Sequence, residues 1–144
     1  MKVIKIAQVP PPAIPMQATV KQAIPLMGSE QGCALAVLDG ERLAGTLSRD
    51  EVLARVVAAG LDPAATKVGD VMTAPAETIT VDTETAEALK LMLSRRRCYF
   101  PVVDHQGALK GWLALCHLFQ DHVDDLGREL DALEAYLSAD GPGG

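Results

Sequence analysis

Two stretches of the chain carry the same order of apolar and polar positions. Residues 20–39 align with residues 85–104 at an offset of 65, and after one extra residue the alignment resumes at an offset of 66. Most matched positions hold apolar or turn residues, such as Ala23 and Ala88, Cys33 and Cys98, Val37 and Val102, and Gly45 and Gly111. Because self-similarity at a fixed period is typical of a duplicated supersecondary unit, we expect two copies of one fold.

The apolar pattern of the first copy predicts alternating strands and helices. The expected elements are a short extended piece at 14–16, a helix at 20–27, strands at 33–38 and 42–47, and a helix at 50–59. Thr19 can serve as the N-cap of the first helix, and Pro25 should shorten or kink it. The Asp39-Gly40 pair between two strand-like runs is a strong hairpin signal.

The second copy repeats this order after a linker. The expected elements are a short linker helix at 68–72, a strand at 78–81, a helix ending near 96, strands at 98–103 and 109–114, and a long helix from 116. Asp82 or Thr83 is the expected N-cap of the helix that ends near 96. At the N-terminus, residues 3–9 alternate weakly and predict a short strand, which the prolines at 10–12 would end.

These elements predict an α/β (α+β) fold built from two β-α-β-β-α repeats. The expected parts are an N-terminal strand with a proline-rich connector at 1–13, repeats at 14–67 and 68–123, a C-terminal helix extension at 124–138, and a flexible tail at 139–144. Helices cover one face of each predicted sheet, so the other repeat is the obvious cover for the second face. A lone repeat of about 60 residues buries only about 60% of its unfolded surface, which also favours packing of the two halves as one unit.

The last predicted helix carries a heptad pattern of apolar residues and an acidic outer face. The apolar positions are spaced by 4, 3, 4, 3 and 4 residues and are Phe119, Val123, Leu126, Leu130, Leu133 and Leu137. Such a stripe needs a partner, and two arrangements remain open. The helix packs against its equivalent in a homodimer, which is our working hypothesis, or it folds back over its own repeats.

Charge and composition argue against several classes of partner. The chain has 13 Lys and Arg against 19 Asp and Glu, and the net charge of −6 opposes binding to nucleic acid or anionic lipid. The only concentrated basic patch is Arg95-Arg96-Arg97. No apolar run approaches the roughly 20 residues that a membrane span needs. The N-terminus lacks a signal-peptide pattern, so a cytoplasmic protein is expected.

The sequence offers no set of residues for catalysis or metal binding. Three cysteines without CxxC spacing predict no disulfide framework, and Cys33 and Cys98 are expected as small core residues. His117 and His122 are five residues apart, so they do not share a helical face as metal ligands would. We therefore expect neither an enzyme nor a metal protein.

Three motifs resemble those of the cystathionine β-synthase (CBS) domain family. Val68-Gly69-Asp70-Val71-Met72-Thr73 resembles its linker signature, Phe100-Pro101-Val102-Val103-Asp104 its second strand and turn, and Gly45-Thr46-Leu47-Ser48 with Glu51 its ligand motif. The resemblance covers about residues 15–123. It implies a tandem CBS pair, or Bateman module, whose repeats are related by a pseudo-twofold axis and which usually dimerises.

Many modules of this family bind adenine nucleotides or S-adenosylmethionine in clefts between the repeats. For the first cleft the resemblance implies the ligand-binding residues Leu47, Ser48, Glu51, Thr78, Ile79, Arg97, Cys98 and Tyr99. Glu51 stands where the family usually has Asp, and its carboxylate can still accept hydrogen bonds from ribose hydroxyls. The guanidinium groups of residues 95–97 suit phosphate oxygens, whereas Asp50 opposes a polyphosphate.

A structural interpretation of the same residues stays open. Ser48 and Glu51 can be a helix cap and a first-turn acid, and the arginines can be a solvated helix end. In the second cleft, Ala114 replaces the hydroxyl, His117 replaces the carboxylate, and the segment 30–32 replaces the arginines. We expect that cleft to be empty or filled by Trp112 and its neighbours.

The resemblance implies a regulatory module that senses AMP, ADP, ATP or S-adenosylmethionine in one cleft and signals through a homodimer. The alternative is a ligand-free scaffold of the same family that only mediates association. The sequence does not identify the effector protein that such a module would regulate.

Overall fold

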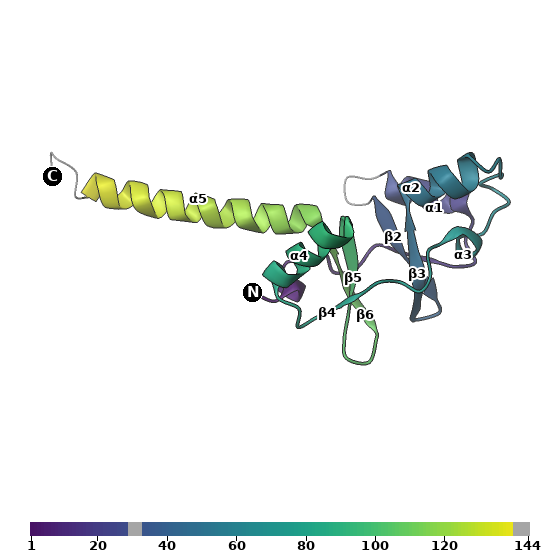
Figure 1. Cartoon of the computed structure of the whole chain (residues 1–144), viewed down its shortest axis with the longest axis horizontal. Coiled ribbons are helices and arrows are strands. Elements are labelled where there is room, and N and C mark those ends of the chain that lie inside the picture. The colour runs from purple at the N-terminus through teal and green to yellow at the C-terminus, as the bar shows by residue number, and fades with distance from the viewer. Residues whose placement is uncertain (29–32, 140–144) are drawn as a thin grey trace.

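The computed structural model describes residues 1–28 and 33–139 of the chain. Two three-stranded sheets with their helices lie side by side, and a long C-terminal helix projects away from them (Figure 1). The expected α/β (α+β) fold with two repeats and an extended C-terminal helix is confirmed. The tail expected at 139–144 begins with the last residue of that helix, and residues 140–144 lie outside the described chain.

The elements lie close to their expected positions, apart from the N-terminal segment. The first repeat comprises β1 Ala13–Pro15, α1 Val20–Met27, β2 Ala34–Asp39, β3 Arg42–Ser48 and α2 Arg49–Val52, which continues as the π-helical turn η2 Leu53–Val57. The linker holds α3 Val68–Val71. The second repeat comprises β4 Ile79–Thr80, α4 Thr85–Arg95, β5 Tyr99–Val103, β6 Leu109–Ala114 and α5 Leu115–Ala139.

Both sheets have the same topology and the same irregularity. β1 runs parallel to β2, which pairs antiparallel with β3, and β4, β5 and β6 repeat this arrangement. The register shifts between Val37 and Leu38 in β2 and between Val102 and Val103 in β5, which are equivalent positions. A bulge at these positions bends and twists each sheet locally. The duplication therefore extends to the irregularities of the backbone.

The two sheets bury their second faces against each other, as expected. Each repeat has its own core under its helices, and a third buried cluster joins Ala34 and Ala36 of β2 to Tyr99 and Trp112 of the second sheet. The Tyr99 and Trp112 rings stack with their centroids 5.0 Å apart. Large aromatic side chains of one repeat thus fill the space that small side chains of the other leave, as close packing requires.

The predicted strand at residues 3–9 is wrong, because this segment forms the 3-10 turn η1 Val3–Lys5. Isolated β-bridges identify the counterpart of this segment in the other repeat. The four bridges are Lys2–Glu84, Gln8–Trp112, Thr19–Lys67 and Thr46–Thr73. The bridges match in pairs at the offsets of 65 and 66 that relate the two repeats. Residues 2–8 are therefore the counterpart of the linker at 67–73, and Val3 is buried in the core of the second repeat.

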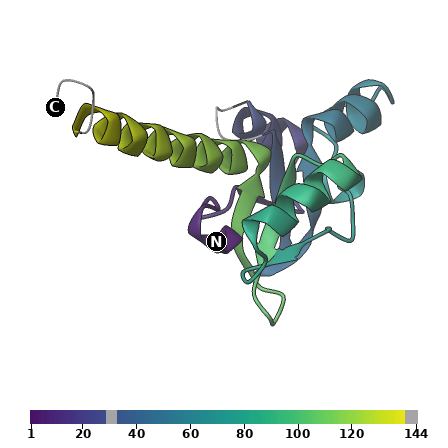
Figure 2. The same cartoon turned by 60° about the vertical axis from the view of Figure 1, so that its left-hand side comes forward.

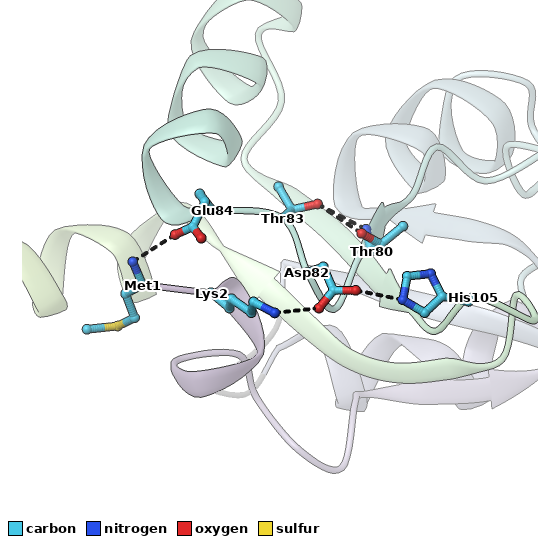
Figure 3. A network of polar contacts seen from close by, with 7 residues as sticks. All are labelled: Met1, Lys2, Thr80, Asp82, Thr83, Glu84 and His105. Atoms are coloured by element: carbon cyan, nitrogen blue, oxygen red, sulfur yellow. Dashed lines mark hydrogen bonds and ion pairs between the residues drawn. The ribbon is translucent and has the colours of Figure 1, made fainter.

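Polar contacts hold the N-terminal segment against the loop before α4 (Figure 3). The amino group of Met1 contacts Glu84 at 2.8 Å. The carboxylate of Asp82 contacts Lys2 Nζ at 2.8 Å and His105 Nε2 at 2.6 Å. Hydrogen bonds from Lys2 and His105 lower the pKa of Asp82 below its ordinary value. All these groups are exposed, so they orient the segment, while the burial of Val3 in the core of the second repeat contributes more to its stability.

The expected N-cap of α4 is wrong. The structure places Glu84 at the N-cap position without a side-chain cap. Asp82 is engaged by the contacts above, and the Thr83 hydroxyl accepts a hydrogen bond from the Thr80 N–H at 3.2 Å. The first free N–H group of the helix, that of Thr85, donates instead to the Met1 carbonyl oxygen at 2.9 Å. The backbone of the N-terminal segment thus replaces a side-chain cap.

The expectations for α1 are confirmed. The Gln22 N–H donates to Thr19 Oγ1 at 3.2 Å, and the Thr19 N–H donates to Gln22 Oε1 at 3.0 Å, which completes a capping box. The helix has eight residues against eleven in α4, in keeping with Pro25 inside it.

His117 takes part in the start of α5. The Ala114 N–H donates to His117 Nδ1 at 3.1 Å, which requires a neutral imidazole whose proton is on Nε2. Desolvation lowers the pKa of His117 below its ordinary value, because burial penalises the charged ring. The neutral ring therefore matches both its surroundings and its hydrogen bond.

α5 does not fold back over its own repeats, so that alternative is wrong. The helix leaves the second sheet and extends into solvent in both views (Figures 1 and 2). Every residue of its heptad stripe from Phe119 to Leu137 is more than half exposed. Within the described residues, no helix combines the length and the apolar character needed to cross a bilayer.

Gly45→Ala should destabilise the protein, because the new Cβ would lie 2.5 Å from the Thr73 carbonyl oxygen and 2.8 Å from the Met72 sulfur. Overpacking of this kind costs about 1–3 kcal/mol. The matched control is Gly111→Ala at the equivalent position, where the nearest atom is the Ala7 Cβ at 3.2 Å. Urea unfolding should show the larger loss for Gly45→Ala, and equal losses would contradict this account of linker packing.

Acidification should weaken the start of α5 through His117. Because the pKa of His117 is lower in the folded protein than its unfolded value of about 6.5, the unfolded chain binds more protons as the pH falls below that value. Stability present at pH 7.5 should therefore decrease below about pH 6.5. His117→Gln, whose amide oxygen accepts at any pH, should lose less between pH 7.5 and 5.5. Urea unfolding of both proteins at the two pH values tests this, and identical losses would count against it.

Candidate functional site

A cleft of about 450 Å³ lies between the two repeats. Its lining comes from the start of β2, the junction of β3 and α2, the linker after α3, and the segment between α4 and β5. The lining residues are Cys33, Ser48, Arg49, Asp50, Glu51, Thr73, Arg96, Arg97, Cys98 and Tyr99. Because both repeats contribute, the cleft exists only in the paired arrangement.

Ser48 and Glu51 form a capping box at the start of α2. The Glu51 N–H donates to Ser48 Oγ at 3.3 Å, and the Ser48 N–H donates to Glu51 Oε2 at 2.9 Å. The other carboxylate oxygen of Glu51 accepts a hydrogen bond from Thr73 Oγ1 at 2.6 Å. The same two residues therefore cap a helix and line the cleft, so the two interpretations of the pair do not exclude each other.

The linker brings Thr73 to this point. The Thr46 N–H donates to the Thr73 carbonyl at 3.0 Å, and the Thr73 N–H donates to the Thr46 carbonyl at 2.9 Å. Gly45 lets the linker approach β3 closely, since a Cβ there would meet the Thr73 carbonyl. Thr73 belongs to the linker motif of the sequence but was not among the residues expected at the site. Its place beside Glu51 depends on a contact between segments that are distant in sequence.

Arg97 is held inside the protein and is not directed freely into the cleft. Its Nη1 contacts Glu77 at 3.3 Å, and its Cζ lies 5.0 Å from the centroid of the Tyr99 ring. Arg95 also pairs with Glu77 and does not line the cleft. A guanidinium over an aromatic face gains a cation–π attraction, which holds Arg97 against Tyr99. Arg97 therefore forms part of the cleft wall and also adds positive charge to the cleft.

Arg96 is the cation of the cleft whose guanidinium N–H groups are available to a ligand. It ends α4 in the left-handed conformation, with φ 52° and ψ 43°, and its side chain is exposed. Within the described part of the chain, no hydrogen bond or ion pair engages its guanidinium. Arg49, by contrast, donates to the Met27 carbonyl from Nε at 3.0 Å and from Nη2 at 2.7 Å. Arg96 can therefore meet an anionic group without breaking a contact in the protein.

The expectation that Cys33 and Cys98 are core residues is wrong. Both are exposed and line the cleft, because each precedes the first buried residue of its strand. The neighbouring protein still desolvates Cys33 partly, which raises the pKa of its thiol. In the described residues, no group of three or more His, Cys, Asp or Glu side chains is arranged to hold a metal ion.

Five of the eight residues expected for ligand binding line the cleft, namely Ser48, Glu51, Arg97, Cys98 and Tyr99. The structure does not bring the other three to the lining. Leu47 is fully buried in the core of the first repeat, and Ile79 is buried in that of the second. Thr78 is exposed just before β4. The lining also includes Arg49, Thr73 and Arg96, which were not among the eight.

The second cleft is described only in part. Ala114 and His117 lie together through the hydrogen bond that begins α5. Trp112 is buried between the sheets and is 1% exposed. Residues 30–32, which correspond to the arginines of the first cleft, lie outside the described residues. The expectation that this cleft is empty or filled stays a prediction.

Comparison with known sequences identifies relatives over most of the chain. Residues 3–58 and 68–120 match the family model of the CBS domain. The chain is 37% identical over 93 residues to the meiotically up-regulated gene 70 protein of Schizosaccharomyces pombe, covering 64% of this chain and 13% of that protein. It is 32% identical over 124 residues to the CBS domain-containing protein CBSX3, mitochondrial, of Arabidopsis thaliana, covering 83% of this chain and 60% of that protein. The chain thus spans less than two thirds of the length of either relative.

Solved structures share the fold. A protein with CBS domains from Burkholderia ambifaria superposes with a TM-score of 0.77 at 27% identity, covering 87% of this chain and 96% of that one. CBSX2 in complex with AMP gives a TM-score of 0.73 at 22% identity, covering 85% and 96% of the two chains. A CBS domain protein of Pyrobaculum aerophilum complexed with AMP gives 0.72 at 19% identity, covering 81% and 89%.

The matches to the family model fall on both repeats, and the neighbours share the arrangement of two sheets that the structure shows. Together these observations establish that the chain belongs to the CBS domain family and contains a tandem pair of CBS domains.

Proposed function

We propose that this protein is a regulatory module that binds an adenosine-containing ligand in the cleft centred on Ser48 and Glu51. One observation carries the proposal: a single cleft between the repeats joins a hydroxyl, a carboxylate and the available guanidinium of Arg96. Neighbours with the same fold hold AMP, which supports an adenine nucleotide as the first ligand to test.

The capping box leaves capacity for a ligand. A carboxylate offers about four acceptor positions. Glu51 uses one on the Ser48 N–H and one on the Thr73 hydroxyl. The remaining positions can accept hydrogen bonds from the two hydroxyls of a ribose. Ser48 Oγ accepts a hydrogen bond of 3.3 Å from the Glu51 N–H, and a hydroxyl that accepts still has its own proton to donate to the ligand.

The charges of the cleft favour a ligand with few phosphates. Arg96 can bind one phosphate group, whereas Arg97 is held by Glu77. Asp50 lines the same cleft next to Glu51 and repels additional negative charge. Among AMP, ADP, ATP and S-adenosylmethionine, we therefore propose AMP or S-adenosylmethionine ahead of ATP.

We propose that the module acts as a homodimer and regulates an effector protein, with no catalytic role of its own. A ligand shifts such a dimer only if it binds one arrangement more tightly than another. Exposed apolar side chains on the repeats offer a surface for that effector: Ile24 of α1 is 44% exposed, and Leu53 and Val57 of η2 are 59% and 61% exposed. A groove of about 330 Å³ with an almost wholly apolar lining lies between α1 and α2.

The second candidate is a ligand-free scaffold of the same family. The hydrogen bonds of Ser48, Glu51 and Thr73 favour it, since these groups already have partners inside the protein. In that case the cleft is a by-product of packing, and the repeats serve only association.

Calorimetric titration with AMP, ADP, ATP and S-adenosylmethionine separates the two candidates. The sensor predicts saturable heat and a rise in melting temperature with AMP or S-adenosylmethionine, because a ligand that binds the folded state stabilises it. Ser48→Ala and Glu51→Gln should each weaken that binding. An absence of heat and of thermal shift with all four compounds would leave the scaffold.

Arg96→Asn should weaken AMP binding by about tenfold, the value expected for a charge-assisted hydrogen bond at an open site. Asn tolerates the left-handed conformation of this position, so the variant should fold normally. Arg95→Asn is the matched control, because Arg95 carries the same charge but does not line the cleft. Equal affinities of the two variants would show that Arg96 does not meet the phosphate.

A further inference from the structure

An apolar stripe runs along most of α5. Phe119 lines a hollow beside Ala86 and Leu89 of α4, and beyond it the described chain does not cover the stripe. Its members lie on one side of the helix, and their exposed fractions are 55% for Phe119, 59% for Val123, 51% for Leu126, 56% for Leu130, 53% for Leu133 and 57% for Leu137. The helix has 25 residues and is about 37 Å long at 1.5 Å per residue. Its first turns lie beside α4, and the rest of the helix extends away from both repeats (Figures 1 and 2).

A single helix of this kind needs a cover. Isolated helices are marginal in water even for favourable sequences, and Gly127 in the middle lowers the helix propensity further. The helix therefore depends on a partner that buries the stripe.

We infer that α5 pairs with α5 of a second copy as an antiparallel two-stranded coiled coil. This inference rests on the homodimer of the proposed function and adds the segment and the orientation that build it. The ligand cleft is not part of the contact.

The width of the stripe and the positions of the charges favour a second copy. A stripe with two apolar residues in every seven is the seam of a coiled coil, whereas a globular surface takes a wider face. The charged residues Asp121, Asp124, Asp125, Arg128 and Asp131 occupy positions away from the seam. Two such acidic helices can therefore approach along the seam with most of their charges in solvent.

The residues that flank the seam select the orientation. In a parallel pair, positions g and e' would place Glu129 beside the partner's Glu134, and symmetry would repeat this repulsion. In an antiparallel pair with full overlap, Glu134 faces the partner's Gln120, and His122 faces the partner's Tyr136. The only like-charge pair along the seam is then Glu129 with the partner's Glu129, and it occurs once.

The antiparallel seam is also complete. Phe119 packs opposite the partner's Leu137, Val123 opposite the partner's Leu133, and Leu126 opposite the partner's Leu130. Gly127 then faces the partner's Gly127 near the twofold axis, where open space surrounds it in the single chain. The dipoles of the two helices oppose each other, which is favourable. The two modules lie at opposite ends, about 30 Å apart along the coil, and leave both ligand clefts open.

Light scattering at tens of micromolar protein tests the seam. Leu130→Asp should halve the mass of the assembly, because a charge enters the centre of the seam. Ala135→Asp, with the same charge on the outward side of α5, should keep the full mass. A monomeric wild type, or a full mass for Leu130→Asp together with Leu133→Asp, would overturn the inference. Both positions are exposed in the single chain, so unchanged melting of the repeats checks that the variants fold.

Spin labels at residue 138 test the orientation. In Ser138→Cys, with the exposed Cys33, Cys98 and Cys116 replaced by Ser, the antiparallel pair separates the labels by about 30 Å along the coil. A parallel pair brings them side by side. A pulsed distance measurement that gives one population at the long distance is expected, and a short distance would overturn the antiparallel arrangement. AMP titration of Leu130→Asp keeps the two proposals apart, because loss of the seam should leave the cleft unchanged.

Discussion

The structure depends on the burial of each sheet's second face against the other sheet. Three strands with helices on one side leave an apolar face that water would solvate at a high cost. The two sheets cover each other with side chains of unequal size. Tyr99 and Trp112 of the second sheet fill the space above Ala34 and Ala36 of the first. That contact also determines where the cleft lies. It brings the start of β5, with Arg97 and its neighbours, opposite the junction of β3 and α2, and neither repeat alone has both walls.

The linkers transmit this arrangement to the polar groups of the site. Each repeat packs against the segment that lies just before the other repeat in the chain. Residues 67–73, which precede the second repeat, pack on the first, and residues 2–8, which precede the first repeat, pack on the second. Because Gly45 allows the closer approach, Thr73 reaches the carboxylate of Glu51 and orients it. A ligand that pulled on Glu51 would therefore act on the linker as well as on α2. The polar contacts of Asp82 with Lys2 and His105 hold the other linker segment from the outside.

The duplication made most of the fold predictable from sequence, because the same order of elements could be inferred independently from each of the two copies. The strands of the two sheets, the hairpin and the Thr19 N-cap all follow from local patterns. The failures at the N-terminal segment and at the cap of α4 share one physical cause, because contacts between residues distant in sequence decide both. Residues 3–9 alternate like a strand, yet Val3 enters a core whose other members begin at Ile79. Asp82 looks like a cap, yet Lys2 and His105 engage it. In the site, Ser48 and Glu51 were within reach of a local motif. The three arginines look alike in the sequence, and only the structure shows that Glu77 pairs with Arg95 and Arg97 and that Arg96 adopts the left-handed conformation at the end of α4.

The divergence of the two repeats is informative because folding does not demand it. The third position of the helix after the return strand needs only an acceptor for a backbone N–H. Glu51 supplies a carboxylate oxygen at 2.9 Å in the first repeat, and His117 supplies Nδ1 at 3.1 Å in the second. Either residue thus satisfies the helix start, although the neutral ring does so at the cost of its charge. The two residues differ in how many hydrogen-bond acceptor positions remain. The Glu51 carboxylate keeps unused acceptor positions in the cleft, whereas the one acceptor nitrogen of His117 is already used by the Ala114 N–H. The first repeat therefore retains a carboxylate that can accept further hydrogen bonds, in the same cleft where Arg96 supplies the opposite charge.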